Sequence, residues 1–303
     1  MPKVNAFHIV SNELAEHGSG TNDAPPGAQR QPAESVGRQP VSLPATYGTD
    51  FTSHLARAHM TIKMIATVCR RPGMTHAEYV THITQVHAAL TLENPVTLKS
   101  YVQNLVLDSA YGADGDPTHR LLVSRDSVTE LYWDSLEAMA QTFAHPHVQQ
   151  RVGPDGPRFA DVRTGLNLIA AEQELPVPAA GPGSAKAMHF LRMAPGLDLQ
   201  AFFERWTTAH EQVLEHDPLL AQTLRRCVQS RQEPRGNEML GYFGADETRH
   251  YEGVNSLWFD DAHSLGLFRR YETALRAFNA RQDRHFYLPA ESFFVYAHEN
   301  RVL

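Results

Sequence analysis

Two histidines, each on the apolar face of a predicted helix, are the residues best suited to chemistry. His87 and His210 lie 123 positions apart in the chain. A histidine enclosed by apolar side chains is favoured as the uncharged imidazole, so it can act as a base near neutral pH. In the alternative interpretation, each is a core histidine bonded to a backbone carbonyl. The residue types leave both interpretations open.

Hydroxyl and carboxyl groups supply the other candidates. Tyr79 and Tyr101 can donate a phenol hydrogen to a carbonyl or enolate oxygen, although such tyrosines often pack with the hydroxyl at the surface. Asp155 and Asp283 precede the last predicted strand of their copies. A carboxylate there can orient a histidine or polarise a substrate, but we expect it more often to tie down a loop. The catalytic candidates are therefore His87, His210, Tyr79, Tyr101 and Asp155.

A flat apolar substrate would need aromatic walls. Trp133, Trp206 and Trp258 are candidates for them, although tryptophans at such positions are core residues in most proteins. Glu130 shares a strand face with Val128 and is either an inward acid or an edge residue. We therefore take Glu130 and the three tryptophans as candidate substrate-binding residues.

The helices that carry the histidines are two copies of one segment. The stretch from Thr75 to Pro95 returns from Asp198 to Pro218, and each copy follows a Pro-Gly turn. Thr75 with Glu78 forms a capping box, and Asp198 stands at the equivalent N-cap. Five pairs share the offset of 123: Pro72 and Pro195, Gly73 and Gly196, Tyr79 and Phe202, His87 and His210, and Pro95 and Pro218.

The rest of the chain repeats with the helix and predicts an α+β fold. Strand and helix patterns follow the order β-α-β-β-α-β twice, which is the ferredoxin-like arrangement. The boundaries are 60–175 for domain 1, 176–185 for a linker rich in Pro and Gly, and 186–303 for domain 2. Residues 1–59 are predicted to be a disordered extension. Because a four-stranded sheet with helices on one side leaves its other face uncovered, we expect the two domains to form one intramolecular dimeric α+β barrel.

Composition excludes several classes of function. The chain has 303 residues and a formal net charge of −7, and no basic run suits a phosphate backbone, so nucleic acid is not expected as a partner. No apolar run approaches the roughly 20 residues that span a bilayer, and two cysteines are too few for a disulfide framework. We expect a cytoplasmic protein with no membrane partner.

Metal and nucleotide motifs are missing from the sequence. His145-Pro146-His147 and the run from His210 to His216 bring histidines close, but neither has the H-E-x-x-H spacing. There is no Walker loop, no G-x-G-x-x-G after a strand and no G-x-S-x-G elbow. The expectation is no metal and no cofactor.

Each copy carries an ordered set of short motifs. Copy one has R-R-P-G-M-T-x-x-E-Y, then H-A at His87, Y-V-Q-N, T-E-L-Y-W-D-S and D-G-P-R-F-A-D. Copy two has A-P-G-x-D-L-x-x-F-F-x-x-W-x-x-x-H, then C-V-Q-S, S-L-W-F-D-D and D-R-H-F. This order of motifs resembles the EthD family of the dimeric α+β barrel superfamily. The resemblance covers about residues 60 to 300, and it departs from the family at Ile83, where the family helix commonly has Trp.

The resemblance implies a cofactor-independent lyase or isomerase, of the dehydratase, cyclase or lactone-isomerase type. Its substrate would be a small aromatic, lactone or polyketide-like molecule, with His87 or His210 as the base. Two alternatives stay open: a barrel enzyme in which a histidine ligates heme, and a non-catalytic accessory protein that binds a small molecule. The sequence leaves open the substrate, the active copy and whether two chains pair into a homodimer of such pseudo-dimers.

Overall fold

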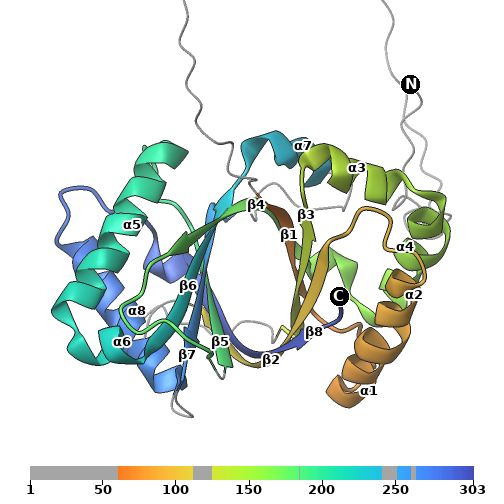
Figure 1. Ribbon diagram of the computed structural model, residues 1–303, viewed down its shortest axis with the longest axis horizontal. Coiled ribbons are helices and arrows are strands. Elements are labelled where there is room, and N and C mark those ends of the chain that lie inside the picture. Colours follow the sequence, from red (N-terminus) through yellow and green to blue (C-terminus); the bar gives the residue numbers. More distant parts are fainter. Residues whose placement is uncertain (1–60, 112–124, 184, 241–250, 261–263) are drawn as a thin grey trace, which may run out of the picture. The chain divides into compact units, whose positions relative to one another are not determined.

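The computed structural model in Figure 1 describes residues 61–111, 125–183, 185–240, 251–260 and 264–303. The predicted extension, residues 1–59, lies outside these ranges. The described residues belong to one compact unit, within which we call 62–175 half one and 185–301 half two.

In half one, one helical segment connects the first strand to the second and another connects the third strand to the fourth, as the sequence pattern predicts. Its helical connections are each built from more than one type of helix. The elements are β1 (Ile62–Val68), α1 (His76–Thr81), the π-helix η2 (His82–His87), α2 (Ala88–Leu92), β2 (Ser100–Tyr111), β3 (Ser127–Trp133), α3 (Leu136–Ala144), the π-helix η3 (Val148–Val152), α4 (Gly153–Phe159), the short 3₁₀ helix η4 (Val162–Thr164) and β4 (Leu166–Leu175).

Half two repeats the order with longer regular helices. Its elements are β5 (Ala185–Leu191), α5 (Leu199–His216), α6 (Pro218–Thr223), β6 (Leu224–Gln232), the 3₁₀ helix η5 (Pro234–Gly236), α7 (Asn237–Leu240), β7 (Gly253–Phe259), α8 (Ser264–Ala280), the 3₁₀ helix η8 (Pro289–Glu291) and β8 (Phe293–Arg301). Figure 1 shows the main helices of the two halves on opposite sides of the strands.

The helix starts follow the predicted capping chemistry. The Thr75 side chain accepts a hydrogen bond from the backbone of Glu78, whose side chain in turn accepts from the Thr75 backbone. Asp198 caps α5 in the same position by accepting from the backbone of Ala201. The Pro-Gly turns place Gly73 and Gly196 at φ of 84° and 79°, a conformation in which glycine carries no steric penalty.

The eight strands close into one antiparallel barrel in the order β1-β3-β2-β8-β5-β7-β6-β4. The halves join where β2 pairs with β8 and β4 pairs with β6. Each sheet edge of one half is therefore hydrogen-bonded to the other half, and the predicted α+β barrel within one chain is confirmed as a closed eight-stranded barrel.

Strand registers show which residues of the two halves are equivalent. Ala66 of β1 faces Thr129 and Asn167 on its two neighbouring strands. His189 of β5 faces Asn255 and Phe294 in the same way. Ala66 thus corresponds to His189, and Asn167 corresponds to Phe294.

The barrel interior holds a buried charge network that crosses between the halves. Glu130 on β3 accepts a hydrogen bond from Lys63 of β1 at 2.8 Å and forms a close ion pair with Lys186 of β5. Because β3 and β5 are not neighbours in the barrel, this second contact spans the interior. Of the two interpretations open for Glu130, the inward acid is the one that the structure shows.

Candidate functional site

A cavity of about 230 Å³ lies in half one. Most of the strand residues around it lie on the helix-facing side of β1, β2, β3 and β4, and the others come from both helical connections. Strand side chains alternate, so these residues face away from the barrel interior. Most of the lining is apolar or aromatic, including Met64, Ile83, Leu131, Trp133, Phe143 and Phe159.

His87 lines this cavity and is held by a buried carboxylate. Its Nδ1 lies 3.0 Å from Oδ2 of Asp155, whose side chain is 2% exposed. A carboxylate accepts hydrogen bonds only, so we assign the imidazole proton to Nδ1. Within the described residues, Nε2 of His87 has no hydrogen-bond partner in the protein. That nitrogen is left as an acceptor, which is the state that a general base requires.

Asp155 also binds His82, whose Nε2 lies 3.1 Å and 3.0 Å from the two carboxylate oxygens. His82 and His87 are five residues apart, which at about 100° per residue would place them on different faces of an α-helix. They bound the π-helix η2, where the Ala88 backbone N–H donates to the Ile83 carbonyl. Residues five apart lie nearly above one another in such an i→i+5 turn, so both imidazoles reach one carboxylate.

The environment of Asp155 keeps it ionised. Burial raises the pKa of a carboxyl group, but hydrogen bonds from His87 and His82 outweigh that effect and hold the pKa of Asp155 below its ordinary value. The Phe159 ring packs on His87, with 4.8 Å between ring centroids, and on His82 at 5.2 Å. Packing and hydrogen bonding thus fix the orientation of His87.

The location of Asp155 differs from the one that the sequence favoured. We expected a loop residue, but Asp155 lies in the first turn of α4, a helix that the pattern did not predict. α3 ends at Ala144, just before His145-Pro146, and the chain then resumes as η3 and α4. This second helical stretch turns the Asp155 side chain toward His87 instead of toward the loop.

Tyr101 is the second catalytic candidate that lines the cavity. Its side chain is 1% exposed, and its oxygen accepts a hydrogen bond from Nε2 of Gln103 at 2.8 Å. Burial raises the pKa of Tyr101 to about 12, partly offset by the bond from Gln103. The phenol therefore stays protonated at neutral pH, and its own hydrogen is available for donation.

Tyr79 is not among the residues that line the cavity. Its hydroxyl lies 2.5 Å from Oγ of Ser127, and its ring packs against Phe159. Burial raises the pKa of the Tyr79 phenol above its ordinary value. His87 and Tyr101 therefore line one cavity, and Asp155 is bonded to His87, whereas Tyr79 lies outside the cavity lining.

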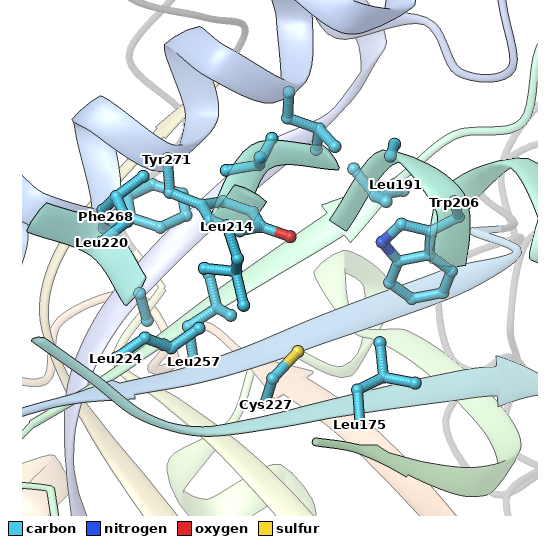
Figure 2. Packing of buried hydrophobic residues seen from close by; sticks show 14 of the residues in the cluster. Leu175, Leu191, Trp206, Leu214, Leu220, Leu224, Cys227, Leu257, Phe268 and Tyr271 are labelled. Atoms are coloured by element: carbon cyan, nitrogen blue, oxygen red, sulfur yellow. The ribbon is translucent and has the colours of Figure 1, made fainter. Parts of the chain in front are cut away.

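His210, the counterpart of His87, lies in a filled core. It is 1% exposed, and its Nδ1 lies 2.9 Å from the Tyr271 hydroxyl instead of a carboxylate. Burial lowers the pKa of His210 to about 4. Figure 2 shows how this core is packed around Trp206, Cys227 and Tyr271. Asp283, which the sequence paired with Asp155, is exposed.

The four candidate substrate-binding residues lie in three different places. Trp133 lines the cavity. Glu130 faces the barrel interior, as does Trp258, whose ring lies 4.7 Å from Nζ of Lys186. Trp206 is fully buried in the core of half two. Only Trp133 is therefore positioned to touch a molecule in this cavity.

Sequence reasoning missed the role of His82. The only signal was the spacing of five between two histidines, which an α-helical pattern treats as out of phase. In the described chain, no group of three or more His, Cys, Asp or Glu residues is arranged to hold a metal ion. None of the described helices is long and apolar enough to cross a membrane.

Comparison with known proteins identifies the family. The model of the EthD domain matches residues 71–163 and 194–280, which together make up more than half of the chain. The chain belongs to the EthD family. Both matched segments of this EthD protein include one of the duplicated histidine helices, so the predicted resemblance is confirmed.

Solved structures similar to this EthD chain have low sequence identity to it. An anthrone oxidase-like protein is 11% identical, with a TM-score of 0.48, and the match covers 81% of this chain and 94% of the other. A chlorite dismutase variant from Candidatus Nitrospira defluvii is 10% identical, with a TM-score of 0.44 and coverage of 78% and 91%. A search of curated proteins found no match.

Proposed function

We propose that half one holds the active site of a cofactor-independent lyase or isomerase. Its substrate is a small, largely apolar molecule that carries a carbonyl group, and His87 is the general base. The observation that carries the proposal is the contact of 3.0 Å between His87 and the buried Asp155 at the wall of an apolar cavity. An oriented imidazole with a free nitrogen in such a cavity is suited to proton transfer.

In the proposed mechanism, Nε2 of His87 removes a proton from the carbon next to the substrate carbonyl. The electron pair of the broken C–H bond moves into the carbonyl group and forms an enolate. The Asp155 carboxylate stabilises the imidazolium that results. The Tyr101 hydroxyl donates a hydrogen bond to the enolate oxygen. Return of the proton to another carbon gives an isomerase, and loss of a leaving group from the neighbouring carbon gives a lyase.

Half one is the active half in this proposal. Its counterpart has Tyr271 in place of the carboxylate partner, and Cys227 stands at the position of Tyr101. The repeated β-α-β-β-α-β order supports two ferredoxin-like domains that share a barrel while only the first keeps the catalytic groups.

The heme alternative does not fit the residues around the cavity. No Lys or Arg is among the described residues that line it, and Asp161 adds a carboxylate. The two carboxylates of a heme would therefore have no cationic partner there.

The test is deuterium exchange. We expect the protein in D₂O to exchange the hydrogens next to the carbonyl in at least one member of a panel of enolisable compounds, from acetylacetone to 2-tetralone. Replacing His87→Ala should slow that exchange by about 10²- to 10⁴-fold, because general-base catalysis typically contributes that much. NMR spectroscopy measures the rate.

The matched control is His210→Gln, in the filled core. Exchange by the folded His210→Gln variant should stay within a few-fold of the wild-type rate. Equal rates for wild type and His87→Ala would remove His87 from the mechanism. A wild-type protein that binds members of the panel without exchanging them would favour the non-catalytic binding alternative.

A further inference from the structure

Half two carries the same arrangement of strands and helices as half one, but larger side chains occupy the place of the cavity. Trp206 stands at the position of Ile83 in the repeated helix, and both are buried. At the equivalent strand positions, His189 replaces Ala66 and Phe294 replaces Asn167. Three side chains with aromatic rings in half two thus replace three smaller side chains of half one. These three smaller side chains all line the cavity.

The replacement of Ile83 by Trp206 is linked to a second position. A Cβ atom added to Gly253 would lie 2.4 Å from Cζ3 of Trp206, which is too close for any side chain. The equivalent residue in half one is Ser127, because Ser127 pairs with Val68 as Gly253 pairs with Leu191. The indole therefore requires glycine on the neighbouring strand.

A third position completes the exchange. In half one, Oγ of Ser127 is bonded to the Tyr79 hydroxyl at 2.5 Å. Half two has Phe202 at the position of Tyr79, and the Phe202 ring stacks on Trp206 with 5.6 Å between centroids. Tyr79, Ile83 and Ser127 therefore form one matched set, and Phe202, Trp206 and Gly253 form the other.

We propose that the ligand of half one is a planar aromatic molecule of two fused rings that carries an oxygen substituent. It occupies the space in half one that is equivalent to the space filled by the rings of Trp206, His189 and Phe294 in half two. Ile83 is the residue that keeps this space open. The inference rests on the proposed function in taking this cavity as the substrate site. It adds the shape and chemical class of the molecule.

The cavity lining agrees with such a ligand. Trp133, Phe143 and Phe159 supply aromatic surfaces, and aromatic rings pack favourably against one another. Asn167, which replaces a phenylalanine of half two, presents an amide to the cavity that makes no hydrogen bond within the described chain. That amide and the Tyr101 hydroxyl are suited to binding a carbonyl or hydroxyl oxygen on the ligand.

The experiment introduces the residue types of Phe202, Trp206 and Gly253 at the equivalent positions of half one. The probes are 2-naphthol, which has two fused rings, and phenol, which has one; isothermal calorimetry of the full chain measures binding. Wild-type protein should bind 2-naphthol at least about tenfold more tightly than phenol because the second ring buries more apolar surface. The triple variant Tyr79→Phe, Ile83→Trp, Ser127→Gly should bind 2-naphthol at least about tenfold more weakly than wild type.

The matched control is the double variant Tyr79→Phe, Ser127→Gly, which lacks the indole and should bind 2-naphthol within a few-fold of wild type. If the triple variant does not fold, Asn167→Phe alone tests the same space and should weaken 2-naphthol binding in the same way. Phenol binding as tight as 2-naphthol, or unchanged 2-naphthol binding in the filled variant, would overturn the proposal.

The outcomes separate this inference from the proposed function. Selective 2-naphthol binding that the triple variant weakens, without carbonyl exchange by wild type, supports the ligand class and removes the catalytic role. Exchange of acetylacetone that depends on His87, without 2-naphthol binding, supports the catalytic role and overturns the ligand class.

Discussion

At the scale of single residues, the difference between the two histidines lies in their partners. His87 is bonded to a carboxylate, and His210 is bonded to a phenol inside a filled core. A carboxylate stabilises the protonated imidazole that proton abstraction produces, whereas a neutral phenol does so much less. The same residue type on the same helical position therefore has different chemistry in the two halves.

Replacing Asp155→Asn tests this difference. The amide can donate a hydrogen to Nδ1 of His87 and so favour the tautomer whose proton points into the cavity. We expect kcat to fall by about 10²- to 10⁴-fold while KM changes little, because substrate contacts remain. Steady-state kinetics on the exchanging substrate measures both constants.

The control for Asp155→Asn is Asp283→Asn, which changes the exposed aspartate that the sequence paired with it. That variant should keep both constants. A loss confined to KM in Asp155→Asn would assign Asp155 to substrate binding instead of to the orientation of His87.

At the scale of elements, one helix type distinguishes the two halves. The helix of half one contains the π segment η2, whereas α5 is regular from Leu199 to His216. The π turn places His82 and His87 on one face, and α4 carries Asp155 to meet them. The site thus depends on two elements whose positions are set by packing.

The packing of α5 against β7 predicts a large effect of a very small substitution. Gly253→Ala should lower the free energy of unfolding by about 1–3 kcal/mol, because the added methyl group overlaps the Trp206 ring. Gly266→Ala is the control, since a Cβ there meets nothing within 4 Å. It should be neutral or stabilise α8 by up to about 1 kcal/mol. Urea unfolding of both variants measures the two changes in stability. Equal changes would contradict the close approach of Gly253 to the Trp206 ring.

The buried histidines of half two predict a dependence of stability on pH. Burial lowers the pKa of His210 to about 4 from 6.5, so between these values the unfolded chain binds a proton that the folded chain does not. The free energy of unfolding is unaffected by His210 above about pH 6.5 and falls by up to about 1.4 kcal/mol per unit as the pH drops toward 4. His189, whose pKa burial lowers to about 3, acts in the same direction.

Urea unfolding of wild type and His210→Gln between pH 7 and pH 5 measures the contribution of His210 to the pH dependence of stability. The difference in stability between the two proteins should shrink as the pH falls. A constant difference over that range would show that His210 does not remain neutral in the folded protein.

At the scale of the whole molecule, the barrel is joined by hydrogen bonds at both sheet edges and by one shared carboxylate inside. Lys63 and Lys186 occupy equivalent strand positions, and both bind Glu130. Half two has Ser256 at the position of Glu130, so a single acid serves both lysines. The Lys63 and Lys186 charges also meet Glu172 and Glu299, respectively, nearer the solvent.

Replacing Glu130→Gln should lower the free energy of unfolding by about 3–5 kcal/mol, because it leaves two buried ammonium groups without their common partner. Glu93→Gln is the control: its ion pair with Arg151 is exposed, and its loss should cost less than about 1 kcal/mol. Chemical denaturation of both variants measures the two losses of stability. Similar small losses in the free energy of unfolding would show that the interior charge network adds little stability.

Much of the fold could be predicted because its signals are local and duplicated. The capping residues Thr75 and Asp198, the Pro-Gly turns and the alternating strands each follow from short-range chemistry, and the offset of 123 shows that the pattern occurs twice. The closed barrel follows because each sheet has an apolar face to cover. His87, Tyr101 and Trp133 were also identified, since their types and positions on predicted elements are visible in the chain.

The sequence by itself therefore determined the duplicated α+β architecture and a short set of candidate residues. Only the tertiary structure decided which of them share a site. Asp155 meets His87 across 68 positions through a π turn and a helix that no periodicity shows, and Glu130 faces the interior because strand closure puts it there. The presence of a cavity in half one and of a filled core in half two depends on the side-chain volumes at Ile83, Trp206 and their neighbours, and packed volume is a property of several distant segments together.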